Sequence, residues 1–156
     1  MAHKVETQWM GKMRFNALVN GHTVTMDAPE RVGGKDAGPI PKPFVLTALS
    51  GCTGMDVVSI LRKQGVEVND FNVVVTGEIS KSHPIVYTSI HLIYEFEGKE
   101  ASMQAALKAV TDSQELFCGV SAMLKKLVPV SWDVTYNGVT IFSNKKEIVP
   151  ELCPVI

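Results

Sequence analysis

The chain has 156 residues, of which 46% are hydrophobic and 20% charged, so it is long enough to bury a substantial core. Its formal net charge is −1 at pH 7 and its basic residues are spread along the chain, which argues against a nucleic-acid-binding face. The N-terminal residues lack the apolar core of a signal peptide, and Ser50, Gly51 and Asp56 interrupt the longest apolar stretch. We therefore expect one cytoplasmic domain over residues 1–156, with no membrane span and no nucleic-acid partner.

The first 27 residues have the pattern of three strands, at residues 4–9, 13–19 and 22–27. Asn20 and Gly21 form the strongest short hairpin signal in the chain. Residues 28–40 are rich in glycine and proline and predict a loop.

A long helix is expected next, between Pro43, which suits a first helical turn, and Gly65, which suits the position after a last turn. Arg62 and Lys63 complement the dipole at its end. Apolar residues lie all round this helix, which predicts burial on every side. One domain covers only one side well, so we expect a second copy of the chain to cover the other, in a homodimer.

The second half of the chain mixes strands and helices. Residues 70–80 and 86–97 alternate between apolar and polar side chains and predict two strands, with His91 solvated or paired across strands. Helical spacing runs from 103 to 110, and a capping box at residues 112–115 predicts a second short helix that carries Cys118. Residues 131–136 and 139–142 predict a final hairpin, followed by a tail over 144–156. This order predicts the α+β class.

The three cysteines, Cys52, Cys118 and Cys153, do not form a disulfide scaffold, and no pair has zinc-site spacing along the chain. No metal or cofactor is therefore expected. Cys52 and Cys118 lie on two predicted buried helices and could meet in the core as a reversible disulfide. Asp56 lies one turn after Cys52 and opposes thiolate formation, so a reactive Cys52 needs a cation from elsewhere.

The proline-led stretch from Pro41 to Cys52 in the long helix, with Cys118 early in a later helix, closely resembles the OsmC/Ohr family. The order of strands and helices matches that family over roughly residues 4–136. The resemblance implies an OsmC-like fold, with an antiparallel sheet packed on a long central helix, in an intertwined homodimer with two thiol sites at its interface. It also implies reduction of organic hydroperoxides, with Cys52 as the peroxidatic and Cys118 as the resolving thiol. The reductant would be a lipoyl-type dithiol or a small thiol.

The chain departs from the hydroperoxide-resistance branch of that family at Lys42, and Lys12 best fits the position of that branch's arginine. That branch has a glutamate ten residues before the first cysteine, where this chain has Lys42. The branch also stabilises its thiolate with an arginine after the first strand, for which Lys12 and Arg14 are the candidates here. Glu115 and Glu30 are candidate carboxylates to orient that cation.

Three functions stay open on sequence grounds. The first is a thiol-dependent peroxidase with a sulfenic acid and then a disulfide at Cys52 and Cys118. The second is a non-enzymatic relative that binds a small apolar ligand or senses redox state. The third is an inert core that contains two buried thiols.

Overall fold

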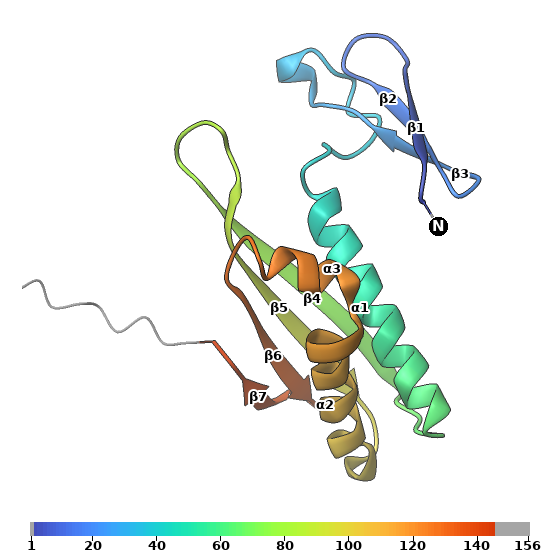
Figure 1. Cartoon of the computed structure of the whole chain (residues 1–156), viewed down its shortest axis with the longest axis vertical. Coiled ribbons are helices and arrows are strands. Elements are labelled where there is room, and N and C mark those ends of the chain that lie inside the picture. Colours follow the sequence, from blue (N-terminus) through green and yellow to red (C-terminus); the bar gives the residue numbers. More distant parts are fainter. Residues whose placement is uncertain (1, 146–156) are drawn as a thin grey trace, which may run out of the picture. The chain divides into compact units, whose positions relative to one another are not determined.

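The computed structural model describes residues 2–145, so Cys153 and most of the predicted tail lie outside the described residues. The chain divides into two compact units, Met1–Thr47 and Ala48–Ile156, with the boundary in the first turn of the long helix. Figure 1 labels the strands and α-helices of both units.

The first unit contains a three-stranded antiparallel sheet in the order β1-β2-β3. Its strands are β1 (Val5–Trp9), β2 (Phe15–Val19) and β3 (His22–Met26). Asn20 and Gly21 connect β2 to β3 with φ angles of 49° and 82°, so both residues of the predicted hairpin turn adopt the left-handed conformation that such turns need. The three predicted strands and this turn are confirmed.

Asp27 organises the loop that follows β3. Its buried carboxylate accepts hydrogen bonds from the backbone N–H groups of Ala28, Lys35 and Ala37 at 2.8–3.1 Å. Donation by the Ala28 N–H is the largest cause that lowers the pKa of Asp27. Gly34 lies so close to Ala28 that a Cβ would fall 1.7 Å from the Ala28 carbonyl oxygen. The loop therefore depends on a carboxylate at 27 and a glycine at 34. It contains one short helix, η1 (Glu30–Val32).

The second unit is built on a four-stranded sheet in the order β4-β5-β6-β7. The strands are β4 (Asp70–Ile79), β5 (Tyr87–Glu97), β6 (Val130–Tyr136) and β7 (Val139–Ser143). Only the β5–β6 pair in this sheet is parallel; the β4–β5 and β6–β7 pairs are antiparallel. The α+β class is confirmed, but the sheet is mixed rather than wholly antiparallel, because a helical crossover after β5 returns the chain to the same end of the sheet.

The crossover contains η2 (Glu100–Ser102), α2 (Met103–Asp112), the π-helical segment η3 (Ser113–Phe117) and α3 (Gly119–Leu124). The predicted capping box at residues 112–115 is wrong. Asp112 and Ser113 both have helical φ and ψ angles and make no side-chain cap, because α2 runs directly into the π-helical turn. The second short helix starts later, with Cys118 as its N-cap residue.

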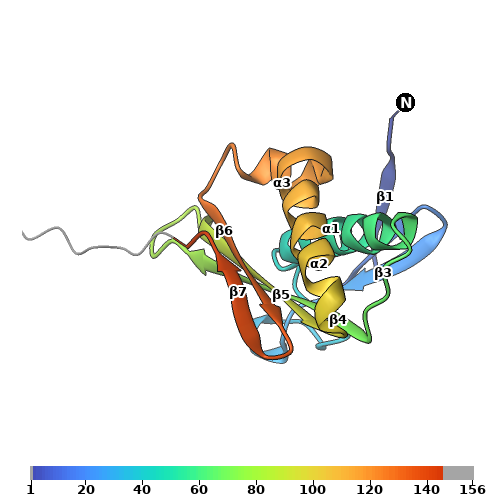
Figure 2. The same ribbon diagram turned by 90° about the horizontal axis from the view of Figure 1, so that it is seen from below.

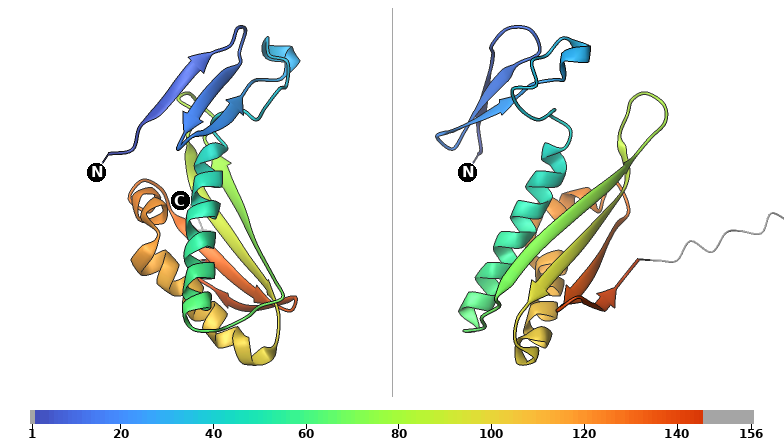
Figure 3. Two further views of the ribbon diagram at one scale, coloured as in Figure 1. Left: turned by 90° about the vertical axis from the view of Figure 1, so that its right-hand side faces the viewer. Right: turned by 180° about the vertical axis from the view of Figure 1, so that it is seen from behind.

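The long helix α1 (Phe44–Lys63) lies with α2 on one face of the four-stranded sheet (Figures 2 and 3). The sheet contributes alternate residues of β5 and β6 to the core beneath them: Ile90, Leu92, Tyr94, Phe96, Trp132, Val134 and Tyr136. Because β5 and β6 pair in register, the side chains of Leu92 and Trp132 point to the same face.

Only one face of α1 is buried, by side chains that recur every fourth residue: Leu49, Thr53, Val57 and Leu61. Met55, on another face, is 71% exposed, so the described residues of one chain do not bury this helix on every side. By length and composition α1 is also apolar enough to cross a membrane, a weak criterion that core helices of water-soluble proteins meet as well.

His91 lies on the opposite face of the sheet from the helices. Its Nδ1 is 2.8 Å from Ser131 Oγ, and its Nε2 is 3.1 Å from an Asp133 carboxylate oxygen. The predicted cross-strand pairing of His91 is confirmed.

Candidate functional site

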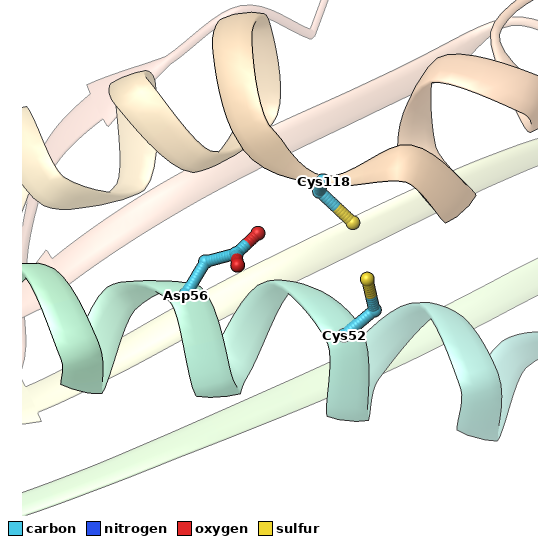
Figure 4. Close-up of side chains that lie close together, drawn as sticks. All are labelled: Cys52, Asp56 and Cys118. Carbon is cyan, nitrogen blue, oxygen red and sulfur yellow. The ribbon is translucent and has the colours of Figure 1, made fainter. Parts of the chain in front are cut away.

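Two free thiols converge between α1 and the start of α3. Cys52 is half-buried on α1, and Cys118 is 2% exposed at the N-cap of α3. The two Sγ atoms and a carboxylate oxygen of Asp56 all lie within 4.8 Å of one another, and the sulfur atoms point toward each other (Figure 4). Asp56 joins the group because residues i and i+4 share one face of a helix. The structure thus brings together the two cysteines that the sequence singles out.

The π-helical turn and the cap of α3 fix the position of Cys118. The Cys118 N–H donates to the Ser113 carbonyl oxygen at 2.8 Å, and the Cys118 sulfur accepts from the Ser121 N–H at 3.4 Å. A π-helical turn inserts an extra residue into the helical ladder and is frequent at functional sites. Here it ends at Phe117, which places the thiol at the start of the next helix, facing α1.

A buried hydrogen-bond network supports both cysteine-bearing segments. The Thr53 hydroxyl is 2.8 Å from both the Tyr94 and the Ser113 hydroxyl oxygens. Gln114 donates to the Tyr94 hydroxyl and accepts from Ser121 Oγ at 2.6 Å. α1, β5, η3 and α3 are therefore joined through polar side chains inside the core. Sequence reasoning missed this network; its one signal was Thr53, a polar residue on the apolar long helix.

Asp56 is held by the same network. Ser113 Oγ donates to a carboxylate oxygen of Asp56 at 3.1 Å and also lies 3.4 Å from the Thr53 carbonyl oxygen. The carboxylate next to the two thiols is thus oriented by a neutral hydroxyl group.

The cation candidates Lys12 and Arg14 belong to the first unit, and the two thiols belong to the second. Within the first unit, the positive charge of Arg14 is one of the causes that lower the pKa of Asp27. The Lys12 carbonyl oxygen accepts from Trp9 Nε1 at 2.8 Å. A role for either side chain at Cys52 stays a prediction.

The structure also locates Glu115 and Glu30, the two carboxylates expected to orient a cation near Cys52. Glu115 forms an ion pair with Lys125 at 3.0 Å, and Lys125 donates to the Gln114 carbonyl oxygen at 2.8 Å. Glu115 therefore anchors a cation beside the buried network, while Asp56 is the carboxylate next to the thiols. Glu30 lies in η1 of the first unit, in the loop that Asp27 organises.

Comparison with known proteins places the chain in a family. The family model for OsmC-like protein matches residues 33–133, which include both cysteines of the site. The chain is a member of the OsmC-like family. Protein YhfA of Escherichia coli (strain K12) is 33% identical to it over 129 residues, or 82% of this chain and 93% of YhfA.

Solved structures of the OsmC-like fold agree. A hypothetical protein from Aquifex aeolicus VF5 is 27% identical and superposes with a TM-score of 0.71, covering 87% of this chain and 98% of its own. The organic hydroperoxide resistance protein OhrB of Bacillus subtilis shares the fold at 16% identity, with a TM-score of 0.60 over 86% of this chain and 98% of its own. The family and fold expected from the sequence are confirmed.

The two thiols of this OsmC-like protein differ in their surroundings. Burial raises the pKa of Cys118 to about 11; the Ser121 N–H lowers it in part, while Cys52 and the charge of Asp56 raise it further. Burial also raises the pKa of Tyr94 to about 12, against the opposing effect of its hydrogen bonds with Thr53 and Gln114. Cys118 is therefore a protonated, protected thiol at neutral pH.

These shifts predict a loss of stability in alkali. The unfolded chain releases the Cys118 proton near pH 9, while the folded chain keeps it until about pH 11. Because the unfolded state then binds fewer protons, Cys118 should lower the free energy of unfolding as pH rises from 9 to 11, and its contribution should be constant above that range. Tyr94 adds a loss of the same sign from about pH 10 to pH 12. Urea unfolding at pH 8, 9, 10 and 11 measures the slope.

A Cys118→Ser variant is the control, because a hydroxyl group can still accept from the Ser121 N–H but does not titrate in this range. Its slope between pH 9 and 10 should be smaller than that of the wild type. An equal slope in the two proteins would contradict the assignment to Cys118.

A groove of about 850 Å³ runs along α1 and β4 of the second unit. Gly51, Gly54 and Phe71 line it, with Arg62 and Lys63 also on its wall. Gly51 and Gly54 flank Cys52 in the chain, so the groove lies next to the turn of α1 that carries the thiol. Its mixture of apolar surface and cations suits a small amphipathic molecule with an acidic group.

Proposed function

We propose that this OsmC-like protein is a thiol-dependent peroxidase that reduces organic hydroperoxides. The observation that carries the proposal is a pair of free thiols from two separate segments, within 4.8 Å of each other, one partly exposed and one buried. An accessible thiol beside a protected one is the arrangement that a peroxidatic and a resolving cysteine need. The relative OhrB is named an organic hydroperoxide resistance protein, which supports the same substrate class.

In the first step the Cys52 thiolate attacks one oxygen of the hydroperoxide. The O–O bond breaks, an S–O bond forms, and the other oxygen leaves as an alkoxide that takes a proton to become an alcohol. Cys52, now oxidised to sulfenic acid, stands next to Cys118. Cys52 takes the first role because it is the more exposed of the two thiols.

In the second step Cys118 displaces the hydroxyl group of the Cys52 sulfenic acid. A disulfide forms, and the hydroxyl group and the Cys118 proton leave as water. A disulfide bond measures about 2.05 Å, so sulfur atoms that lie within 4.8 Å of each other must approach by less than about 3 Å. An external dithiol of the lipoyl type then reduces the disulfide by exchange and is itself oxidised to a disulfide. The cycle needs no bound cofactor.

We place this reaction in a cytoplasmic homodimer. Large apolar side chains are exposed around the thiol site, on α1 (Met55), η3 (Leu116 and Phe117) and α3 (Met123). Their contact with a second copy of the chain would remove this apolar surface from water. A cation, Lys12 or Arg14 of either subunit, would then offset the charge of Asp56 and favour the thiolate. Sedimentation equilibrium should give the mass of two chains.

The test is to titrate the reduced protein with cumene hydroperoxide and count its free thiols. We expect two thiols to disappear per chain for each equivalent of peroxide, and an added dithiol to restore both. A Cys153→Ser variant should behave identically, because Cys153 has no part in the cycle. If both thiols stay free in excess peroxide, the proposal is wrong.

A second candidate, binding of a small amphipathic ligand without turnover, is favoured by the groove beside α1. Lys42, which replaces the glutamate of the hydroperoxide-resistance branch, also favours ligand binding without turnover. A Cys52→Ser variant that binds a fatty acid with unchanged affinity would support this function. Rapid peroxide turnover with a dithiol reductant would exclude it as the main one.

A further inference from the structure

Two thiols and one carboxylate form a compact set of metal-ligand groups in the second unit. Cys52 and Asp56 lie one turn apart on α1, Cys118 faces them from the N-cap of α3, and the three ligand atoms lie within 4.8 Å of one another (Figure 4). We propose that Cys52, Asp56 and Cys118 bind a thiophilic divalent cation of the Zn²⁺ or Cd²⁺ type. Cys52 and Cys118 are far apart in the sequence, so the spacing of the cysteines alone does not predict this site.

The donors and their spacing suit such an ion. Zinc binds thiolates at about 2.3 Å and carboxylates at about 2.0–2.2 Å, which places the donors of a tetrahedral centre roughly 3.5–3.8 Å apart. Donors that lie within 4.8 Å of one another are at most about 1.3 Å from that spacing. Three protein ligands leave a fourth position for water or an external thiol.

The charges at the site favour a cation with two charges. A carboxylate beside two thiols disfavours both thiolates, because each new negative charge is repelled by the others. A divalent ion reverses this effect, since it attracts all three groups. Binding releases one proton from each thiol to solvent and transfers no electrons.

The surroundings of the ligands are already ordered. Ser113 donates to one oxygen of Asp56 at 3.1 Å, which orients the carboxylate, and Ser113 itself is fixed by Thr53 at 2.8 Å. The Ser113 carbonyl oxygen also accepts from the Cys118 N–H, so one residue supports two of the three ligands. Partners that orient metal ligands in this way strengthen metal binding.

This inference does not depend on the peroxidase proposal, because it requires only reduced thiols. One molecule should not bind the metal ion and reduce peroxide at the same time. A disulfide between Cys52 and Cys118 removes two of the three ligands, and a bound ion occupies the sulfur that would attack peroxide. Metal binding is therefore measured without peroxide, so that either proposal can fail alone.

The test is to titrate the reduced full-length chain with Cd²⁺ and follow the thiolate-to-cadmium absorption in the ultraviolet. We expect saturation at one ion per chain and displacement of the cadmium signal by Zn²⁺. An Asp56→Asn variant should bind at least about tenfold more weakly, because it loses a charged ligand. A Cys52→Ser variant should lose about half of the absorption at saturation.

Two variants are matched controls. Asp112 lines the same small hollow as Asp56 but pairs with Lys108, so an Asp112→Asn variant should bind as the wild type does. A Cys153→Ser variant should keep one ion per chain. Circular dichroism checks that each variant is folded. The proposal is wrong if the wild type shows no saturable absorption, or if a folded Cys52→Ser variant absorbs as the wild type does. If the Asp56→Asn variant binds with wild-type affinity, Asp56 is not a ligand.

Discussion

A Cys52→Ser variant is expected to reduce organic hydroperoxides at no more than the rate of buffer alone, a loss of at least about 10³-fold, since the nucleophile is gone. A hydroxyl group at position 52 is not ionised at neutral pH and does not displace an alkoxide from peroxide. The buried Cys118 cannot take over, because its raised pKa keeps it protonated. Oxidation of the added dithiol, followed with cumene hydroperoxide as substrate, measures the effect.

A Cys118→Ser variant separates the first step of the reaction from the second. It should still react with one equivalent of peroxide, because Cys52 is intact, but it should stop at the sulfenic acid. A reagent that traps sulfenic acids should then label Cys52. Turnover of the dithiol by Cys52→Ser at a wild-type rate would show that the attacking thiol has been wrongly assigned.

A Thr53→Val variant is expected to unfold with about 2 kcal/mol less free energy than the wild type, because hydrogen-bond partners are left unsatisfied in the core. The Thr53 hydroxyl group lies 2.8 Å from the hydroxyl oxygens of Tyr94 and Ser113, and it is fully buried. Valine has nearly the same shape, so packing changes little and the loss reports on the network. Urea unfolding monitored by circular dichroism gives the difference.

Thr111→Val is the matched control on the neighbouring helix. The Thr111 hydroxyl group is only part-buried and donates to the Leu107 carbonyl oxygen, within its own helix. Its replacement should change the free energy of unfolding by no more than about 0.5 kcal/mol. Equal losses in the two variants would mean that the buried network contributes nothing beyond an ordinary helix hydroxyl group.

The strands and the long helix were predictable because local signals set them. Asn20 and Gly21 favour one kind of turn, and the alternation over residues 70–80 allows only one face of that strand to be buried. The cysteine pair was predictable because Cys52 and Cys118 were expected on two buried helices, and the resemblance to the OsmC/Ohr family pointed to the same two residues. These signals lie within short segments and do not depend on the rest of the fold.

The start of the helix at Cys118 could not be read from the sequence. Asp112 and Ser113 are residue types that often cap a helix, but here α2 continues through a π-helical turn, in which Ser113 hydrogen-bonds to Thr53. The parallel β5–β6 pair was missed for a related reason, since it depends on how the whole crossover packs against the sheet. In both cases contacts between distant segments decide the local structure.

The central claim, that Cys52 and Cys118 form one redox pair, is tested most directly by peptide mapping after oxidation. The reduced protein is treated with one equivalent of cumene hydroperoxide, its remaining thiols are alkylated, and the digest is analysed by mass spectrometry. We predict a disulfide-linked pair of peptides that contains Cys52 and Cys118, with Cys153 alkylated. Alkylated Cys52 and Cys118, or a disulfide that joins either one to Cys153 instead, would contradict this account.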